Sequence, residues 1–216
     1  MFARTARFAW RTACLAVGVD NVSLLRIRRR ADLCTLGSRS GAWVVPATLF
    51  HQGDVCYCVG CGEDISFDLA VLERFGCQVF AFDPTPRAVQ HVALAAGGRS
   101  DYVFREIGLW DRDELLRFYA PKDPRHVSHS ALNLQGTSEY FEARVRRLSE
   151  VMRANGHTRL TLLKLDIEGA EYRVLDSILE DCLDIAVLCV EFDEYFAPLD
   201  SRFRRRISQA VGKLLS

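Results

Sequence analysis

The sequence predicts an α/β protein with a doubly wound, mostly parallel sheet and helices on both faces. Short apolar runs alternate with helix-like segments between residues 55 and 192, and this alternation is typical of such folds. The first run, at 55–60, is apolar throughout, as expected of a central parallel strand buried on both faces. It ends in two closely spaced glycines before a helical pattern, so strand, glycine turn and helix form the first unit.

The other elements follow in order along the chain. Residues 64–75 place apolar side chains at helical spacing, with Asp64 as the expected N-cap and Gly76 as the expected stop. Two prolines open the next helix, which runs through Ala96. The expected strands are 55–60, 78–83, 102–109, 160–166 and 185–192, with an extra strand at 114–119, an irregular loop at 124–137 and a helix at 170–180.

Length and charge limit the classes of partner. The 216 residues, of which 49% are apolar, fit one domain with a sizeable core. The 28 basic residues balance the 28 acidic ones, so no nucleic-acid partner is expected. No apolar run reaches the ~20 residues that span a bilayer, so no transmembrane segment is expected. The composition leaves the oligomeric state open.

Residues 1–36 are expected to form a basic helical extension ahead of a single domain at 37–216. Arg4, Arg7 and Arg11 fall on one helical face, and the basic run RIRRR continues the charge. Arginines without acids also occur in organellar transit peptides, but those are usually rich in serine and this segment is not. A cytoplasmic location is therefore favoured over an organellar one.

The eight cysteines are expected to be reduced thiols, because no secretory signal is recognisable. Cys56, Cys58 and Cys61 lie close together in the sequence. However, the first two fall in an apolar strand, and no second Cys/His pair follows at zinc-ligand spacing. We expect buried thiols and no metal site.

The glycine turn after strand 55–60 is the candidate cofactor site, because doubly wound sheets bind ligands beyond the carboxyl ends of their strands. Gly60 and Gly62 allow backbone to approach a ligand closely. A dinucleotide fingerprint would have a third glycine where this chain has Ile65. Glu63 and Asp64 at the helix start would repel a pyrophosphate and favour a positively charged ligand.

S-adenosylmethionine has the chemistry that suits this turn, since it carries a sulfonium and an ammonium group and no phosphate. Asp83, about twenty residues further on at the tip of the next strand, is placed to accept hydrogen bonds from the ribose hydroxyls. The alternative is an ordinary turn, with Asp83 as an N-cap before Pro84. The preceding strand, the following helix and the spacing of the acid together favour the cofactor interpretation.

Three stretches resemble the FkbM-type S-adenosylmethionine-dependent methyltransferases, a branch of the class I, Rossmann-like methyltransferases. They are VGCGEDISFDLAVLERFGCQVFAFDPTP from Val59, HVSHSALNL from His126 and LLKLDIEGAEYRVLDSIL from Leu162. The run KLDIEGAE is the most specific, because acid-x-E-G-A-E after a buried strand is not a general methyltransferase feature. With GSRSGAWVVP from Gly37, the similarity spans about residues 37–195.

The resemblance implies a Rossmann-like methyltransferase sheet and methyl transfer from S-adenosylmethionine to an acceptor oxygen, often on a sugar or natural-product scaffold. Its cofactor-binding residues would be Gly60, Gly62 and Glu63 on the methionine side, Asp83 at the ribose, Ile107, Gly108 and Leu109 on the adenine side, and Asp166 at the methyl-transfer end. Glu168 would stand beside Asp166.

Two features depart from the family pattern. Many relatives have a histidine after the EF of the fifth strand, whereas this chain has Asp193 in VEFDEYF. Little length follows that strand, so the C-terminal β-hairpin that completes the fold is expected to be missing. Alternatively, extra strands near residues 114 and 140 form the sheet edge.

Methyl transfer to a hydroxyl requires an aligned acceptor and a base. Asp166 and Glu168 supply carboxylates at a strand end, although acids there also act as helix caps. His129 is another candidate base because imidazole titrates near neutrality, and a surface histidine is the plain alternative. Lys164, within a buried strand, is expected to pair with Glu191.

Two other functions stay open. A nicotinamide-dependent oxidoreductase would require the missing third glycine. A catalytically degenerate binding protein on a methyltransferase fold is the stronger alternative, given Asp193 and the short C-terminal part. The sequence predicts a small hydroxylated acceptor without identifying it, because acceptor pockets lie in variable loops.

Overall fold

The computed structural model describes residues 10, 13–14, 16–17, 27–123, 125–195 and 198–216. Two compact units are present: one is Asp32–Asp193, and the other comprises Met1–Ala31 and Glu194–Ser216. Arg4, Arg7 and Arg11 of the expected N-terminal helix lie outside the described residues, whereas Arg28, Arg29 and Arg30 of the basic run are described and are not helical. The division of the chain at 36/37 stays a prediction. No helix in the described parts is both long and apolar enough to cross a membrane.

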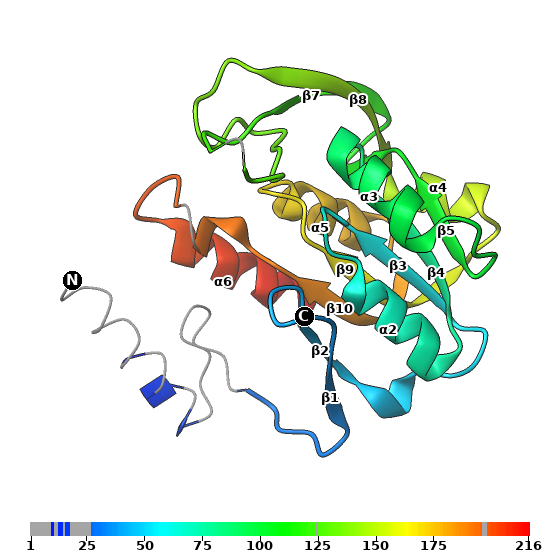
Figure 1. Ribbon diagram of the computed structural model, residues 1–216. Helices are drawn as coiled ribbons and strands as arrows, with labels where there is room; N and C mark the ends of the chain where they lie inside the picture. The colour runs from blue at the N-terminus through cyan, green and yellow to red at the C-terminus, as the bar shows by residue number, and fades with distance from the viewer. Residues whose placement is uncertain (1–9, 11–12, 15, 18–26, 124, 196–197) are drawn as a thin grey trace. The chain divides into compact units, whose positions relative to one another are not determined.

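The main sheet of the larger unit has five parallel strands in the order β10-β9-β3-β4-β5 (Figure 1). The central strands β3 and β9 are almost entirely buried, which explains their continuous apolar sequences. This arrangement confirms the predicted fold class. The strands are β3 Val55–Val59, β4 Gln78–Phe82, β5 Tyr102–Arg105, β9 Arg159–Leu165 and β10 Asp184–Val190.

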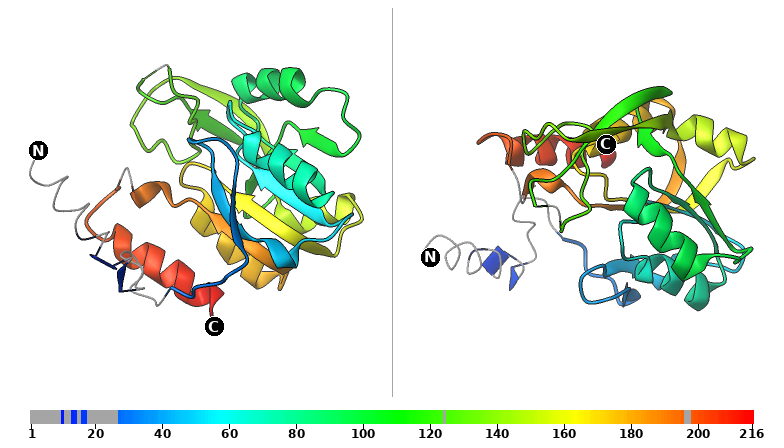
Figure 2. Two further views of the ribbon diagram at one scale, coloured as in Figure 1. Left: turned by 60° about the horizontal axis from the view of Figure 1, so that its bottom comes forward. Right: turned by 45° about the horizontal axis from the view of Figure 1, so that its top comes forward.

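Helices cover both faces of this sheet (Figures 1 and 2). Helices α2 (Ser66–Phe75) and α3 (Pro86–Ala96) bury side chains in one shared core, while α4 (Leu148–Ala154) packs with α5 (Glu171–Glu180) on the other face. Right-handed crossovers explain this division, because the chain moves outward in opposite directions after β3 and after β9. Strand order therefore reverses between β3 and β9, where doubly wound sheets bind ligands.

The sequence signals predicted the end of helix α2 but not its start. Asp64 is wrong as the N-cap, because α2 begins at Ser66 with Ile65 at the N-cap; Asp64 Oδ1 accepts a hydrogen bond from the Ser66 amide at 3.0 Å. Gly76 ends the helix in the left-handed conformation with φ of 66°, as predicted. In the other unit, helix α6 spans Phe203–Leu214.

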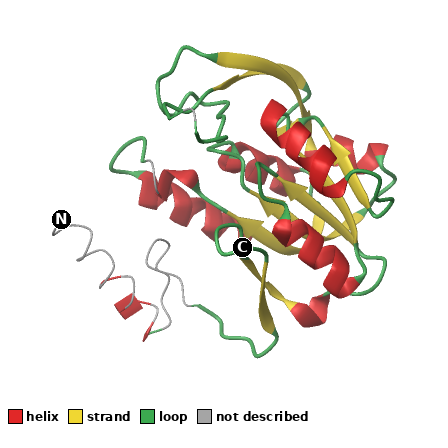
Figure 3. Cartoon of the chain, viewed as in Figure 1, coloured by secondary structure: helices red, strands yellow, loops and turns green. Residues whose placement is uncertain are grey.

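The predicted strand 102–109 is wrong as a single element. It divides into β5 of the main sheet and β6 (Gly108–Trp110), which pairs with β8 (Tyr140–Arg147). Strand β7 (Glu114–Tyr119) pairs with β8 on its other side, so β6-β8-β7 is a separate three-stranded sheet (Figure 3). The expectation that the strands near 114 and 140 extend the main sheet is therefore also wrong.

A short hairpin and two 3-10 turns also belong to the described structure. Strands β1 (Leu33–Leu36) and β2 (Trp43–Pro46) form an antiparallel hairpin, followed by a 3-10 turn at Ala47–Leu49. Strand β1 lies within the segment expected to be a helical extension. After β10, the described residues contain a 3-10 turn at Asp193–Tyr195 and helix α6, and no strand.

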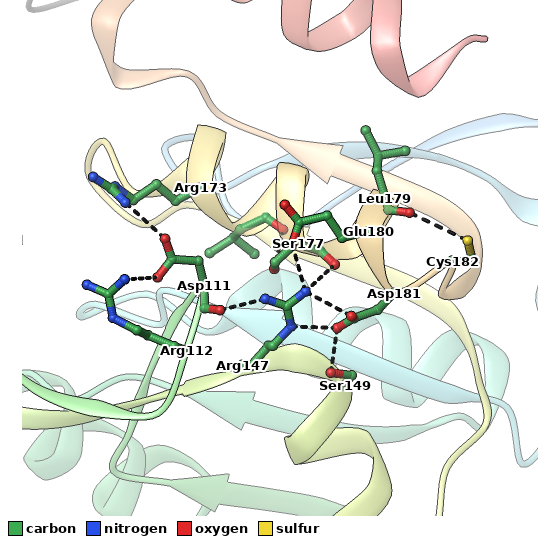
Figure 4. Close-up of polar contacts among 11 residues, drawn as sticks. Asp111, Arg112, Arg147, Ser149, Arg173, Ser177, Leu179, Glu180, Asp181 and Cys182 are labelled. Carbon is green, nitrogen blue, oxygen red and sulfur yellow. Dashed lines mark hydrogen bonds and ion pairs between the residues drawn. The ribbon is translucent and has the colours of Figure 1, made fainter.

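Arg147, at the end of β8, joins the three-stranded sheet to helix α5 (Figure 4). Its guanidinium donates to both carboxylate oxygens of Asp181 at 2.7 and 2.8 Å, and to Glu180 at 2.9 Å. It also donates to the backbone carbonyl of Asp111 at 2.7 Å. Paired donation of this kind fixes geometry as well as adding energy. One side chain therefore connects β8, α5 and the segment after β6.

We predict that Arg147→Met lowers the free energy of unfolding by about 1–3 kcal/mol, because Asp181 loses its cation and the Asp111 carbonyl loses its donor. Arg112→Met is the matched control: Arg112 pairs with Asp111 and Glu114 but is 63% exposed, so a loss of about 0–1 kcal/mol is expected. Urea unfolding of both variants measures the difference. Equal losses would contradict the role given to Arg147.

Candidate active site

A pocket of ≈ 240 Å³ opens at the carboxyl ends of β3, β4 and β9, within the unit Asp32–Asp193. Its lining contains every residue proposed from the sequence except Ile107. After β5 the chain leaves the main sheet. Gly108 and Leu109 line the pocket, whereas Ile107 does not. The proposed residues in the lining are Gly60, Gly62, Glu63, Asp83, Gly108, Leu109, His129, Asp166 and Glu168.

Glycine is needed at the two positions of the turn for different structural reasons. Gly60 has φ of 84°, and a Cβ there would lie 1.7 Å from the backbone oxygen of Asp166. Gly62 has φ of 51°, and its nearest neighbour would be a methyl group of Val127 at 3.6 Å. Gly60 is therefore required by the neighbouring strand, whereas Gly62 is required by its backbone conformation alone.

Three successive backbone amides of this turn donate within the protein. The Gly60 amide donates to the Phe82 carbonyl at 2.9 Å, and the Cys61 and Gly62 amides both donate to Asp83 Oδ2 at 2.9 Å. Phosphate-binding turns instead direct free amides at the anion. These three amides are therefore not available to hold a phosphate.

Asp83 is buried, with 5% of its surface exposed, and its carboxylate holds the turn in place. Besides the two amides on Oδ2, its Oδ1 accepts a hydrogen bond from the Thr85 amide at 2.8 Å. A carboxylate offers about four acceptor positions, so about one remains, on Oδ1, for a ligand. Its proposed contact with a ribose stays a prediction.

Lys164 is a buried cation of the pocket, at 5% exposure. Its ammonium donates to the Gly60 carbonyl at 2.6 Å, lies 3.4 Å from Asp166 Oδ2 and faces the Trp43 ring at 5.4 Å. Burial alone would lower its pKa, but nearby carboxylates, Asp166 foremost, raise it. The expected ion pair with Glu191 is not formed: Lys164 pairs with Asp166 instead, although its charge also acts on Glu191.

Glu168 lines the same pocket in an unusual backbone conformation, with φ of 55°. Burial raises the pKa of this carboxyl group to about 8, and the charges of Asp193 and Asp166 add to the effect. Ser128 donates a hydrogen bond that partly offsets the rise. A carboxylate with this pKa is a much stronger base than an exposed glutamate.

The loop after Arg125 is held over the pocket by two sets of hydrogen bonds. Arg87 pairs with Glu63 at 2.6 Å and donates to the carbonyls of Arg125 and His126 at 3.4 Å. Ser130 Oγ donates to the Glu168 carbonyl at 2.6 Å. Glu63 therefore acts as a link to this loop as well as a lining residue.

His129, in the same loop, places Nδ1 2.9 Å from the Val127 carbonyl and packs its ring against Phe141. A carbonyl is only an acceptor, so Nδ1 carries the proton in the neutral ring and Nε2 is left as an acceptor. His129 therefore keeps the chemistry of a base.

The hairpin between β1 and β2 supplies lining residues that the sequence did not assign to the site. Ser38 Oγ donates to Asp64 Oδ2 at 2.5 Å, and the Ser38 amide donates to Ser66 Oγ at 2.7 Å. These bonds hold the hairpin turn at the start of α2 and bring Trp43 to the pocket. The similarity of the run GSRSGAW to FkbM-type methyltransferases was the sequence signal that could have assigned this hairpin to the site. The unassigned lining residues include Ser40, Gly41, Trp43, Phe118, Val127, Ser128 and Ile167.

The model of the methyltransferase FkbM domain matches residues 54–210 of the chain. The chain belongs to the FkbM methyltransferase family. No solved structure matches it. Among curated proteins, the FkbM relative "31-O-demethyl-FK506 methyltransferase FkbM" of Streptomyces tacrolimicus is 31% identical over 160 residues, covering 59% of this chain and 60% of the relative.

Mammalian proteins also align with this FkbM family member. "Probable methyltransferase-like protein 24" of Rattus norvegicus is 30% identical over 129 residues, covering 59% of this chain and 29% of the relative. The Homo sapiens protein of the same name is 27% identical over 129 residues. The chain thus spans less than two thirds of the length of each of these curated relatives.

We predict that Gly60→Ala lowers the free energy of unfolding by about 2–5 kcal/mol, from backbone strain and the clash with the Asp166 carbonyl together. Gly62→Ala carries only the strain of its left-handed conformation and should cost about 1–2 kcal/mol. Denaturant unfolding of the two variants provides the comparison. A Gly60 variant no less stable than the Gly62 variant would show that the two strand ends are not in close contact.

Proposed function

We propose that this chain is an S-adenosylmethionine-dependent methyltransferase that methylates a hydroxyl group of a sugar, natural product or other small molecule. The observation that carries the proposal is a glycine turn whose Gly60, Cys61 and Gly62 amides donate within the protein, in a pocket whose charged lining residues are mainly acids. The Streptomyces tacrolimicus relative is named as a methyltransferase of 31-O-demethyl-FK506, which supports an oxygen acceptor. A cytoplasmic location is also proposed, because the eight cysteines are free.

The pocket fits the expected methyl donor. S-adenosylmethionine supplies a methyl group on a positively charged sulfur, and its amino-acid part carries an ammonium group. Among the lining residues the carboxylates outnumber the one lysine, so a positively charged ligand is favoured and a phosphate is not. The carboxylates are those of Glu63, Asp64, Asp83, Asp166 and Glu168, and the lysine is Lys164.

A nicotinamide dinucleotide fits the same site poorly. The position of the third glycine is taken by Ile65, which is 2% exposed and belongs to the hydrophobic core. Neither does any observation favour a binding protein without activity, since the described pocket keeps both candidate bases. We therefore favour the enzyme over both alternatives.

In this proposal the residues of the pocket have separate roles in binding and in proton transfer. Asp83 holds the turn and offers its remaining acceptor position to the ribose, and Asp166 lies at the methyl-transfer end with Lys164 beside it. Glu168 accepts the proton of the acceptor hydroxyl, and His129 is the second candidate for that role. Trp43 and Phe118 supply apolar lining that excludes water.

Calorimetric titration tests the cofactor assignment. We expect micromolar binding of S-adenosylmethionine, no comparable binding of NAD, and loss of binding in Asp83→Ala, because that variant leaves three amides without their acceptor. Asp101→Ala is the matched control, since Asp101 lies outside the pocket and pairs with Arg99 at the surface. Circular dichroism establishes that each variant is folded. A folded wild type that does not bind S-adenosylmethionine would overturn the proposed function.

Turnover of hydroxylated acceptors distinguishes the two candidate bases. If Glu168 is the base, Glu168→Gln should lower kcat by about 10²–10⁴-fold while the affinity for S-adenosylmethionine changes little. His129→Gln should then have a much smaller effect. The opposite pattern would assign the base to His129, and an unchanged kcat in both variants would exclude both residues.

A further inference from the structure

Glu171 Oε2 and Asp193 Oδ2 are buried, and neither receives a hydrogen bond from an N–H group or a hydroxyl of the described residues. Glu171 is only 1% exposed, and the two side chains are in hydrogen-bonding contact with each other. Two ionised carboxylates in this position would repel each other, and neither oxygen would have a donor. A single proton between the two groups satisfies both oxygens.

The other oxygen of Glu171 holds the turn that carries Glu168. Its Oε1 accepts hydrogen bonds from the Gly169 amide at 3.0 Å and the Ile167 amide at 3.3 Å. These amides flank Glu168, whose left-handed backbone needs such support. Asp193 follows β10, so the contact ties the end of that strand to this turn.

The carboxylates around the pair favour retention of the proton. Asp193 also contacts Glu168 and is affected by the charges of Asp166 and Glu191. The nearby cation is Lys164, which is paired with Asp166, and Ser128 faces Glu168 from the loop. Burial, followed by the repulsion between the carboxyl groups, raises the pKa of Asp193 to about 8, and burial raises the pKa of Glu171 to about 7.

We propose that Glu171 and Asp193 share one proton and act as a positioning pair that holds Glu168 against the pocket. The role given to Glu168 rests on the proposed function, whereas the shared proton does not. While the proton is present, the pair fixes the turn through the Ile167 and Gly169 amides. Loss of the proton places neighbouring carboxylates in repulsion and loosens the turn.

The pair makes stability depend on pH in a defined direction. The pair binds its shared proton more tightly in the folded than in the unfolded chain, where the pKa values of the two carboxyl groups are 4.5 and 3.8. The contribution of this proton is therefore complete below those values and is lost as pH rises through about 7 to 8. Asp193→Asn should reduce this loss, because an amide N–H donates to Glu171 at every pH.

The first experiment combines infrared spectroscopy with thermal unfolding at several pH values. Wild type near pH 6 should show the carbonyl band of a protonated carboxyl group, and its Tm should fall by about 4 °C or more between about pH 6 and pH 8.5. Asp193→Asn should weaken the carbonyl band and reduce the fall in Tm between these pH values. The control Asp184→Asn, an exposed change at the start of β10, should keep both the band and the decline. A wild type without the band, or an Asp193→Asn variant with the full decline, would overturn the shared proton.

The second experiment separates positioning from general stability. Asp193→Ala should increase amide exchange at Ile167 and Gly169 by about tenfold or more, as expected when a buried carboxylate loses its partner, and Asp193→Asn should restore protection. Where turnover is measurable, Asp193→Ala should lower kcat with little change in KM. Unchanged exchange at these two amides in a folded Asp193→Ala would overturn the positioning role. Neither infrared nor exchange requires methyl transfer, so failure of the proposed function would be recognised separately.

Discussion

The site depends on the close approach of two neighbouring strand ends, those of β3 and β9. The Asp166 carbonyl lies so near Gly60 that no side chain fits between them. Lys164 then donates to the Gly60 carbonyl and pairs with the Asp166 carboxylate, so one buried cation connects both ends. Because parallel neighbours release their loops at the same edge of a sheet, this contact brings the glycine turn and the Glu168 turn to one pocket.

Carboxylates in a partly buried pocket are costly unless donors, cations or protons neutralise them. The structure uses each of these. Asp83 receives three backbone amides, and Asp166 lies beside Lys164. Glu168 and Asp193 are buried near other carboxyl groups, and their pKa values rise. A site that combines carboxylates held by donors with carboxyl groups of raised pKa suits both a cationic ligand and a proton transfer.

Periodicity predicted the main sheet well, because its central strands are buried on both faces and are apolar throughout. It failed at residues 102–109, where a continuous strand-like pattern conceals a change of sheet: β6 leaves β5 to pair with β8, which lies some thirty residues further along the chain. The choice between pairing partners depends on distant segments and has no local signal. The same limit applies to Trp43, which reaches the pocket only through the bond between Ser38 and Asp64.

Residue types and their order along the chain were enough to establish the α/β class, the position of the glycine turn and the acidic character of the pocket, since these follow from local periodicity and composition. Tertiary structure decided how those acids are used. It assigned Asp83 to three amides, paired Lys164 with Asp166 and brought Asp193 to Glu171. A hydrogen-bond partner and a pKa depend on burial and on neighbours from other strands, and only the packed sheet brings those neighbours together.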